Sequence, residues 1–387
     1  MHHFVTPGKL ILAAFLGFAA CHHSMAAAER NPFTTDVFVK GTNGYHSYRI
    51  PALIVAKNGT LLAFSEGRKN SLSDHGDVDL VLRRSHDNGG TWQQLQLVYE
   101  EGDTTKITIG NPCPVLDRRT GRIWLPFCRD NNDILMTFSD DAGQTWAKPR
   151  VITESVKKPA WGWYATGPGV GIQLAGGPHA GRLAIPCDHR ERLGGKWVML
   201  SHVFYSDDHG RSWQLGGSVA RHTDECQIVE MAGGTLMINM RNYWGRTGKR
   251  PERDKMRAVA VSRDGGATWG PLRFDKTLVE PICQASFLRY STSANGGRNR
   301  LLFANPASPK TRQRLTIRLS YDEGRRWPVA RVLHRGPSAY SSLAVLPDGT
   351  VGCLYEGGKR DAYEKILFTR CSLRWLTRGK DASSSRP

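Results

Sequence analysis

An eight-residue pattern, Ser-x-Asp-x-Gly-x-Thr-Trp, occurs five times in this chain of 387 residues, and we call each copy a box. The third box has Ser212 in the Thr position, and the fifth has Arg326 there. The starts of successive boxes are separated by 54, 67, 56 and 58 residues, so a unit of nearly constant size repeats along the chain. The boxes lie at residues 85–92, 139–146, 206–213, 262–269 and 320–327.

The residue types of the box are those of a tight turn between strands. The Asp side chain accepts hydrogen bonds from nearby backbone N–H groups, Gly supplies the positive φ, and Ser or Thr closes the loop. The Trp packs the loop onto a neighbouring strand, and its N–H is free to find an acceptor. One such box is found in many hairpins, but five at this spacing predict repeated β-sheets.

Short apolar runs separated by turn residues divide the chain into six units of about four strands each. Asn58-Gly59 and Asp348-Gly349, each between two apolar runs, are strong hairpin patterns. Six antiparallel sheets of this kind predict an all-β fold, a six-bladed β-propeller. The first strands of the units are expected at 48–56, 112–117, 169–174, 225–231, 282–290 and 340–346.

The two ends of the chain carry further expectations. A strand at 36–40 precedes the first unit and is expected to become the outer strand of the last one, which closes the ring. We expect one propeller domain over residues 29–377 and a disordered tail over 378–387. Residues 1–28 have the pattern of a signal peptide, with an apolar run at 10–20 and a small-residue cleavage site at 26–28.

This pattern predicts export, to the periplasm or out of the cell. The apolar run is too short to span a membrane. Cys21 leaves open a lipoprotein anchor as the alternative. Seven cysteines follow the expected cleavage site, without Cys-x-x-Cys spacing, so we expect no zinc site and no complete disulfide framework. The apolar surroundings of several of them predict buried free thiols, namely Cys113, Cys128, Cys187 and Cys353.

The formal net charge of the whole chain is +18, and the sequence pI is about 9.8. The Lys and Arg residues are scattered, without a basic-aromatic recognition module, and the expected export further disfavours nucleic acid as a partner. An anionic substrate fits this charge better. No metal or other cofactor is expected.

The direction of the strands selects the face on which a site is expected. The start of the first strand, the end of the second and the start of the third share one face of the ring, whereas the boxes lie on the other. Each polar residue at these positions, taken alone, is most simply a solvated charge, a turn former or a packed strand residue. Together they predict one mouth that binds an anionic carboxylate, because guanidinium groups bind carboxylates bidentately. These residues are Arg49, Arg68, Asp74, Glu225, Arg241, Arg312, Tyr340 and Glu356.

These positions lie in segments that, together with the boxes, resemble bacterial exo-α-sialidases over about residues 33–375. The likeness is carried by Tyr48-Arg49-Ile50-Pro51, Glu66-Gly67-Arg68, Ser73-Asp74-x-Gly-Asp77, Glu225-Cys226-Gln227, Asn239-Met240-Arg241, Ala339-Tyr340-Ser341 and Leu354-Tyr355-Glu356. The boxes resemble the Asp boxes of that family.

The resemblance implies a role for each residue. Arg49, Arg241 and Arg312 resemble the three arginines that bind the sialic acid carboxylate. Arg68 resembles an additional arginine beside them, and Glu356 the acid that orients the first. Asp74 resembles the acid/base, Tyr340 the nucleophile and Glu225 the carboxylate that helps to deprotonate it. Arg314 and Arg318 lie an even number of residues from Arg312 on the same expected strand and so point to the same side. The sequence therefore leaves open which of them is the third arginine.

The implied activity is hydrolysis of terminal α-ketosidically linked sialic acid from glycoproteins, glycolipids and oligosaccharides, with retention through a tyrosyl-enzyme intermediate. A neutral phenol suits this substrate because its own carboxylate repels an anionic nucleophile. We expect partial burial to raise the pKa of Asp74, as a general acid requires. The loops 109–112 and 161–169 are candidates for lining the pocket, or are ordinary connections between sheets.

Other functions compete with this one. A carbohydrate-binding propeller without catalysis has the same boxes, and so does an enzyme that transfers sialic acid, releases an anhydro sugar or takes a related keto-deoxy sugar acid. A basic scaffold for nucleic acid is the remaining alternative. The linkage preference and the oligomeric state are left open by the sequence.

Overall fold

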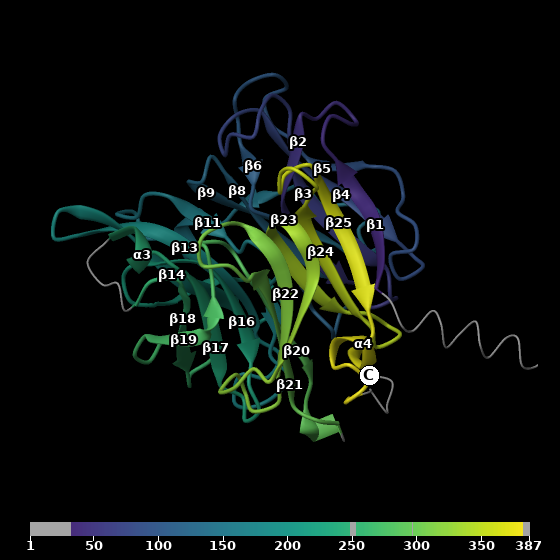
Figure 1. Ribbon diagram of the computed structural model, residues 1–387. Helices are drawn as coiled ribbons and strands as arrows, with labels where there is room; N and C mark the ends of the chain where they lie inside the picture. The colour runs from purple at the N-terminus through teal and green to yellow at the C-terminus, as the bar shows by residue number, and fades with distance from the viewer. Residues whose placement is uncertain (1–31, 248–252, 296, 382–387) are drawn as a thin grey trace, which may run out of the picture.

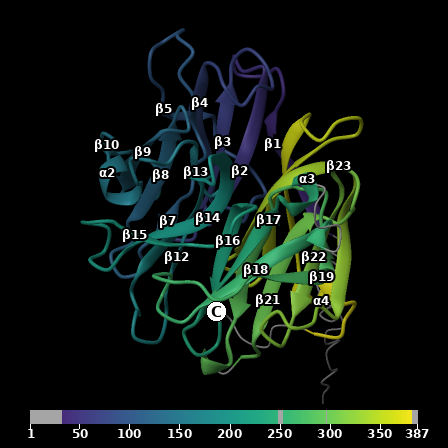
Figure 2. The ribbon, with the colours of Figure 1, turned by 90° about the vertical axis from the view of Figure 1, so that its left-hand side faces the viewer.

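The computed structural model describes residues 32–247, 253–295 and 297–381. Antiparallel β-sheets make up almost all of this part of the chain and are arranged like the blades of a propeller (Figures 1 and 2). The helical elements are single turns, α2 (Thr153–Val156), α3 (Trp244–Thr247), α4 (Leu373–Leu376) and the 3₁₀ turn η2 (Ser293–Asn295). None of the helices in the described residues is long and apolar enough to span a membrane.

The first two sheets come from the amino-terminal part of the described chain. One contains β2 (Ser47–Val55), β3 (Leu61–Arg68), β4 (Val78–Ser85) and β5 (Gln96–Tyr99). The next contains β6 (Ile109–Gly110), β7 (Val115–Leu116), β8 (Ile123–Arg129), β9 (Asp133–Ser139) and β10 (Arg150–Val151).

The remaining sheets follow in chain order. One is built from β11 (Tyr164–Thr166), β12 (Ile172–Gln173), β13 (Leu183–Leu193), β14 (Lys196–Ser206) and β15 (Gln214–Ser218). Another has β16 (Thr223–Glu230), β17 (Leu236–Asn242), β18 (Met256–Ser262) and β19 (Arg273–Val279). A seven-stranded sheet contains β20 (Ser286–Ser291), β21 (Arg300–Pro306), β22 (Gln313–Ser320), β23 (Val329–Val345), β24 (Val351–Gly357), β25 (Lys365–Cys371) and β1 (Phe33–Val39).

The seven-stranded sheet joins the two ends of the chain. Its long strand β23 pairs with β22 through residues 329–337 and with β24 through residues 338–345. β1 pairs antiparallel with β25, with Phe33 opposite Arg370 and Val39 opposite Lys365. The prediction that the strand before the first unit pairs with the last unit is therefore confirmed.

Two predicted strands are interrupted. The expected strand at 112–117 is replaced by β6 and β7, and the expected strand at 169–174 by β11 and β12. Pro112, Pro114 and Pro168 lie in the two gaps and have no N–H to donate to a ladder. The apolar runs in these segments correctly predicted buried residues, but they did not predict that the strand pairing would be interrupted.

All five boxes have the same hydrogen bonds. In the first box, Thr91 N and Thr91 Oγ1 donate to the Asp87 carboxylate at 2.9 and 2.8 Å, and Gly89 N donates to Ser85 Oγ at 2.9 Å. In the fifth box, Arg326 takes the place of Thr. Its backbone N–H and its Nε donate to Asp322 at 2.8 and 2.9 Å, so the turn keeps both bonds despite the substitution.

Each box rests on the preceding sheet of the ring. The Asn88 side chain of the first box donates to Asp348 in the β23–β24 turn, and the Trp124 indole of β8 donates to the His209 carbonyl of the third box at 3.0 Å. Glu323 of the fifth box accepts from Ala232 N in the β16–β17 turn. The boxes and these turns share one face of the molecule, as predicted, so the opposite face is free for a site.

The chain ends differ in part from expectation. Residues 378–381 fall in the tail expected to be disordered, but they belong to the described chain, and Asp381 pairs with Arg300 at 2.7 Å with both side chains buried. Residues 382–387 and the expected signal peptide, 1–28, lie outside the described residues. Burial of the free thiols is confirmed for all four cysteines expected to be buried.

The boxes predict how stability depends on pH. Slight burial acts to raise the pKa of Asp87 and Asp264, but hydrogen bonds from the neighbouring backbone, Ser and Thr outweigh it and bring each pKa to about 2. An unfolded Asp titrates near ~3.9, so these groups contribute stability above about pH 4 that is lost as the pH falls from ~4 to ~2.

We therefore expect the Tm to fall over this pH window, and the double variant Asp87→Asn/Asp264→Asn to have a lower Tm at pH 6 and a shallower fall. Differential scanning calorimetry from pH 2 to pH 6 measures both. An equally steep fall in the variant would contradict the prediction.

Candidate active site

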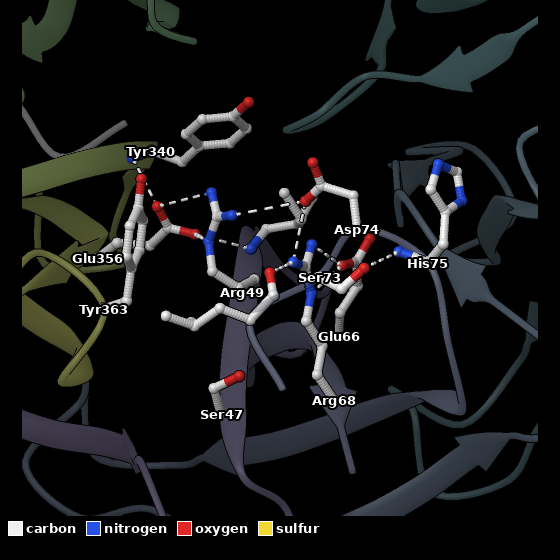
Figure 3. Close-up of polar contacts among 12 residues, drawn as sticks. Ser47, Arg49, Glu66, Arg68, Ser73, Asp74, His75, Tyr340, Glu356 and Tyr363 are labelled. Carbon is white, nitrogen blue, oxygen red and sulfur yellow. Dashed lines mark hydrogen bonds and ion pairs between the residues drawn. The ribbon is translucent and has the colours of Figure 1, made fainter. Parts of the chain in front are cut away.

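The carboxylate of Glu356 is fully buried and binds the guanidinium of Arg49 (Figure 3). Arg49 Nε and Nη2 donate to its two oxygens at 2.7 and 3.3 Å. The same carboxylate accepts from Ile50 N at 3.0 Å and from Tyr340 N at 3.1 Å. Glu356 on β24 thus fixes Arg49 on β2 and the backbone of Tyr340 on β23.

A bulge in β2 directs Arg49 into the mouth of the ring. The β2–β3 register shifts between Arg49 and Ala52, and Ile50 has a φ of 59°. This is a strained conformation for a β-branched residue, and such strain is typical of functional sites. The hydrogen bond from Ile50 N to Glu356 stabilises it. The polar mouth and the strained backbone therefore depend on one another.

Tyr340, Glu225 and Arg241 form a second cluster, in which Tyr340 and Arg241 are buried and Glu225 is partly buried. The Tyr340 hydroxyl donates a short hydrogen bond to Glu225 Oε1, and Arg241 Nη1 donates to Glu225 Oε2 at 2.6 Å and to the Tyr340 oxygen at 3.0 Å. Burial and the charge of Glu225 raise the pKa of Tyr340 well above its usual value, against the opposing charges of Arg241 and Arg312. The phenol is therefore neutral, with a carboxylate in place to accept its proton.

Asp74 lies across the mouth from this cluster, with a side chain that is 65% exposed. Its carboxylate is 2.9 Å from Arg68 Nη1 and 3.7 Å from Arg49 Nη1. Burial acts to raise its pKa, but the charges of Arg68 and Arg49 outweigh burial and lower the pKa of Asp74. The raised pKa expected from the sequence is wrong for the free protein, because both arginines lie closer than strand positions could indicate.

Arg312 lies at the site, whereas the two alternative arginines do not. Its guanidinium is 5.5 Å from the centre of the Tyr340 ring, and Nη1 donates to the Tyr363 hydroxyl at 2.8 Å. Arg314 has a φ of 61° beside a shift in the β22–β23 register, and its side chain is exposed. Arg318 is buried farther along β22 and donates to Asn305 at 3.3 Å. The bulge at Arg314 interrupts the alternation of side chains along β22, so residues an even number of positions apart no longer point to the same side.

The structure brings all eight residues predicted from the sequence together through direct contacts. Besides the pairs above, the Arg49 guanidinium lies 5.1 Å from the centre of the Tyr340 ring, which joins the two clusters. Four guanidinium groups face one mouth, with the phenol on one side and the Asp74 carboxylate on the other. In the described part of the chain, no group of three or more His, Cys, Asp or Glu side chains is arranged to hold a metal ion.

Two residues that contribute to the site, Glu66 and Tyr363, were not predicted as site residues. Glu66 binds Arg68 Nη2 at 2.6 Å and accepts from Asn111 N at 2.9 Å, so it orients Arg68 as Glu356 orients Arg49. The Tyr363 ring lies 4.3 Å from the Arg49 guanidinium carbon. The position of Glu66 two residues before Arg68 on one strand was a usable clue. Tyr363 lies in a loop after β24, and no local pattern marks it.

The Glu356–Arg49 pair predicts a large effect on stability. Replacing Glu356 with Ala leaves a buried guanidinium and two buried N–H groups without their partner, so we expect a loss of ~3–5 kcal/mol in the free energy of unfolding, measured with urea. The control is Asp36→Ala, which removes the partly exposed Asp36–Lys365 pair at 2.6 Å and should cost less than ~1 kcal/mol. Similar losses in the two variants would show that Glu356 is not the central contact.

The comparison with known proteins agrees with this geometry. Residues 59–353 match the BNR repeat-like domain. The chain is 36% identical to a sialidase of Micromonospora viridifaciens over 88% of its length and 54% of the relative. It is 31% identical to an exo-alpha-sialidase of Aspergillus fumigatus, covering 87% of this chain and 86% of that one. The chain spans 54% and 61% of the bacterial relatives from Micromonospora viridifaciens and Bacteroides fragilis.

Solved structures give the same relationship. The structure superposes on a Hadza microbial sialidase with a TM-score of 0.78 and 28% identity, covering 89% of this chain and 69% of that one. A leech intramolecular trans-sialidase has a TM-score of 0.74 at 19% identity, over 89% of this chain and 71% of that one, which shows a shared fold. From its repeats, its fold and these relatives, the chain belongs to the sialidase family.

Proposed function

We propose that the protein is an exo-α-sialidase that hydrolyses terminal, α-ketosidically linked sialic acid on glycoproteins, glycolipids and oligosaccharides. The observation that carries the proposal is the neutral Tyr340 phenol hydrogen-bonded to Glu225 among four arginines, with Asp74 on the other side of the mouth. The names of the relatives support the same reaction. A protein that only bound carbohydrate would have no need of a partly buried base hydrogen-bonded to a buried phenol.

The substrate carboxylate is bound by Arg49, Arg241 and Arg312. Each of them has a guanidinium within 5.5 Å of the Tyr340 ring or oxygen, so an anion between them lies next to the nucleophile. Their charges are fixed because guanidinium groups stay protonated, and Glu356 and Glu225 hold two of them in place. This supports an exo-acting enzyme for a sugar that carries its own carboxylate.

The chemistry then follows two displacement steps. The Tyr340 oxygen bonds to the anomeric carbon while its proton passes to Glu225, and Asp74 protonates the leaving oxygen as the glycosidic bond breaks. In the second step, Asp74 takes a proton from water, the water oxygen bonds to the anomeric carbon, and the bond to Tyr340 breaks. Tyr340 then recovers its proton from Glu225. Two inversions give net retention.

Substrate binding also prepares Asp74. In the free protein Arg49 and Arg68 lower the pKa of its carboxyl group, which opposes a general acid. A substrate carboxylate on Arg49 offsets that positive charge and brings a second anion near Asp74, and both effects raise its pKa. Protonation of Asp74 is thereby coupled to the arrival of a substrate that carries a carboxylate.

We also propose the finer architecture and the location. Counting β23 as the last strand of one blade and the first strand of the next gives six blades, and its pairing with β22 and then with β24 supports this count. Export to the periplasm or the medium rests on the amino-terminal sequence alone. Amino-terminal sequencing of the mature protein tests it, since cleavage after Ala28 and lipidation at Cys21 give different ends.

The central prediction concerns Tyr340→Phe and Asp74→Ala. Tyr340→Phe removes the nucleophile, so we expect kcat for 3′-sialyllactose to fall at least ~10³-fold; Asp74→Ala removes the general acid and should lower it by ~10²–10⁴-fold. With 4-methylumbelliferyl N-acetylneuraminate the loss in Asp74→Ala should be smaller, because this leaving group needs less protonation. Proton NMR of the first product should show the α-anomer of sialic acid.

Folded wild-type protein that binds sialic acid without turning over either substrate would favour a carbohydrate-binding propeller instead. Turnover that gives the β-anomer first would contradict the tyrosyl intermediate.

A further prediction uses the pH profile. If Asp74 must be protonated, kcat/KM falls as the pH rises through its pKa in the free enzyme. Arg68→Gln removes a positive charge 2.9 Å from the carboxylate, which raises that pKa, so the falling limb should move to higher pH even as KM increases. The matched control is Arg122→Gln, whose partner Asp140 lies in a box on the far face. A limb that stays in place in Arg68→Gln would exclude Asp74 as the group that titrates.

A further inference from the structure

An extended hairpin lies beside Asp74 on the side away from Tyr340. Strands β13 and β14 have 11 residues each, and beyond Arg190 they pair only with one another. Trp163 joins this hairpin to the Asp74 loop, because its ring lies 5.8 Å from the ring of His75. Figure 3 shows Tyr340, Arg49, Asp74 and His75 in this order across the mouth, with the His75 ring directed away from the arginines.

Trp163 is held firmly in this position. Its indole N–H donates to the buried carboxylate of Asp188 at 3.2 Å, and its carbonyl accepts from Arg190 N at 2.9 Å. Trp197 lies against the same segment, since a Cβ at Gly162 would meet its ring at 3.2 Å. Trp197 is nevertheless 51% exposed. Two indole rings therefore lie in a row that begins next to His75, the residue after Asp74; the ring of Trp163 is held by hydrogen bonds and that of Trp197 is open to solvent.

The arginines of the hairpin lie on the same face as these rings. Residues two apart on a strand point to one side, and Arg192 pairs directly with Trp197 across the hairpin, so Arg190, Arg192 and Trp197 share a face. The Arg190 and Arg192 guanidinium carbons lie 5.7 and 5.3 Å from the rings of Trp163 and Trp197. Glu191 points to the opposite face, where it lies 3.8 Å from His189.

Both guanidinium groups are exposed, and neither has an ion pair with any described residue. The four arginines of the catalytic mouth are different, because each lies against a carboxylate or a tyrosine there. Exposed cations that stack on aromatic rings without an acidic partner are suited to an external anion. Ring faces suit the apolar faces of a sugar, as in other ligand sites lined by aromatic side chains.

We propose that this face of the hairpin, formed by His75, Trp163, Arg190, Arg192 and Trp197, is a binding subsite for the leaving part of the substrate, and that it favours a leaving saccharide carrying a negative charge. The inference rests on the proposed function, because the leaving oxygen must lie within hydrogen-bond reach of Asp74 and the sugar attached to it then extends past His75. The acidic group is either a second sialic acid or a sulfate on the next sugar.

The test compares three substrates that share the terminal sialic acid. 3′-Sialyllactose has a neutral leaving group, and its 6′-sulfated form differs from it only by the sulfate. In the α2,8-linked sialic acid dimer, the leaving group is the second sialic acid. We expect the wild-type protein to prefer at least one acidic substrate over 3′-sialyllactose in kcat/KM. In Arg190→Gln/Arg192→Gln this preference should fall ~5- to 20-fold, mainly through KM, and added salt should lower it in the wild type.

The matched control is Arg211→Gln/Arg263→Gln, which removes two exposed arginines from boxes on the far face and should keep the wild-type preference. Equilibrium binding of the same three saccharides to Tyr340→Phe, with and without the hairpin substitutions, measures the subsite in the absence of turnover. Comparison of the sulfated substrate with the sialic acid dimer shows which acidic group is recognised.

Equal kcat/KM for acidic and neutral substrates in the wild type, or an unchanged preference in the hairpin variant, would overturn the subsite. A protein that fails to hydrolyse even 3′-sialyllactose would refute the proposed function, and the binding measurement would then decide the subsite separately.

Discussion

The contact on which the site depends is the buried carboxylate of Glu356. It accepts from the Arg49 side chain, from the strained backbone at Ile50 and from the backbone of Tyr340, and these residues come from the first and the last parts of the fold. A carboxylate enclosed in this way is stable only with full hydrogen bonding. The same bonds that compensate for its burial hold one arginine and the proposed nucleophile in a fixed relation.

The same design is repeated around the mouth with different partners. Glu66 orients Arg68, and Glu225 orients Arg241 while it also binds the Tyr340 hydroxyl. Arg49, Arg68 and Arg241 thus each have one side occupied by a carboxylate of the protein, and each lies at the mouth. This pre-arrangement of fixed charges is how sites stabilise an anion and its transition state without reorganisation.

Much of this was predictable because strand direction and side-chain alternation are properties of the sequence. The boxes marked one face of the ring as structural. The ends of the apolar runs placed five of the site residues on the opposite face, namely Arg49, Arg68, Arg241, Tyr340 and Glu356. Position along a strand does not give the distance between side chains of different sheets. The lowered pKa of Asp74 was missed for that reason, since it depends on Arg49 and Arg68 reaching the same carboxylate.

Local departures from ideal strands were also invisible to a periodic pattern. Arg314 kept the parity of Arg312 in the sequence, but the bulge at its positive φ places it outside the mouth. Proline residues interrupted two expected strands in the same way. Tyr363 comes from a loop, where no periodicity exists, and only its contact with Arg49 reveals it. Trp163 lies in the loop 161–169, which the sequence offered as a candidate pocket lining, but its contact with His75 could not be predicted from the sequence.

The joining of β1 to β25 has a consequence for how this protein matures. Thr34 and Thr369, which are separated by 335 positions, meet through a hydrogen bond of 2.8 Å, and the Arg49–Glu356 bond crosses the same junction between the first and last sheets. The two halves of the carboxylate site are therefore brought together by ring closure, which joins distant parts of the chain and is for that reason expected to be slow. A chain in which the first and last sheets have not yet paired has no complete carboxylate site. The onset of ligand binding during refolding therefore reports the closure of the ring.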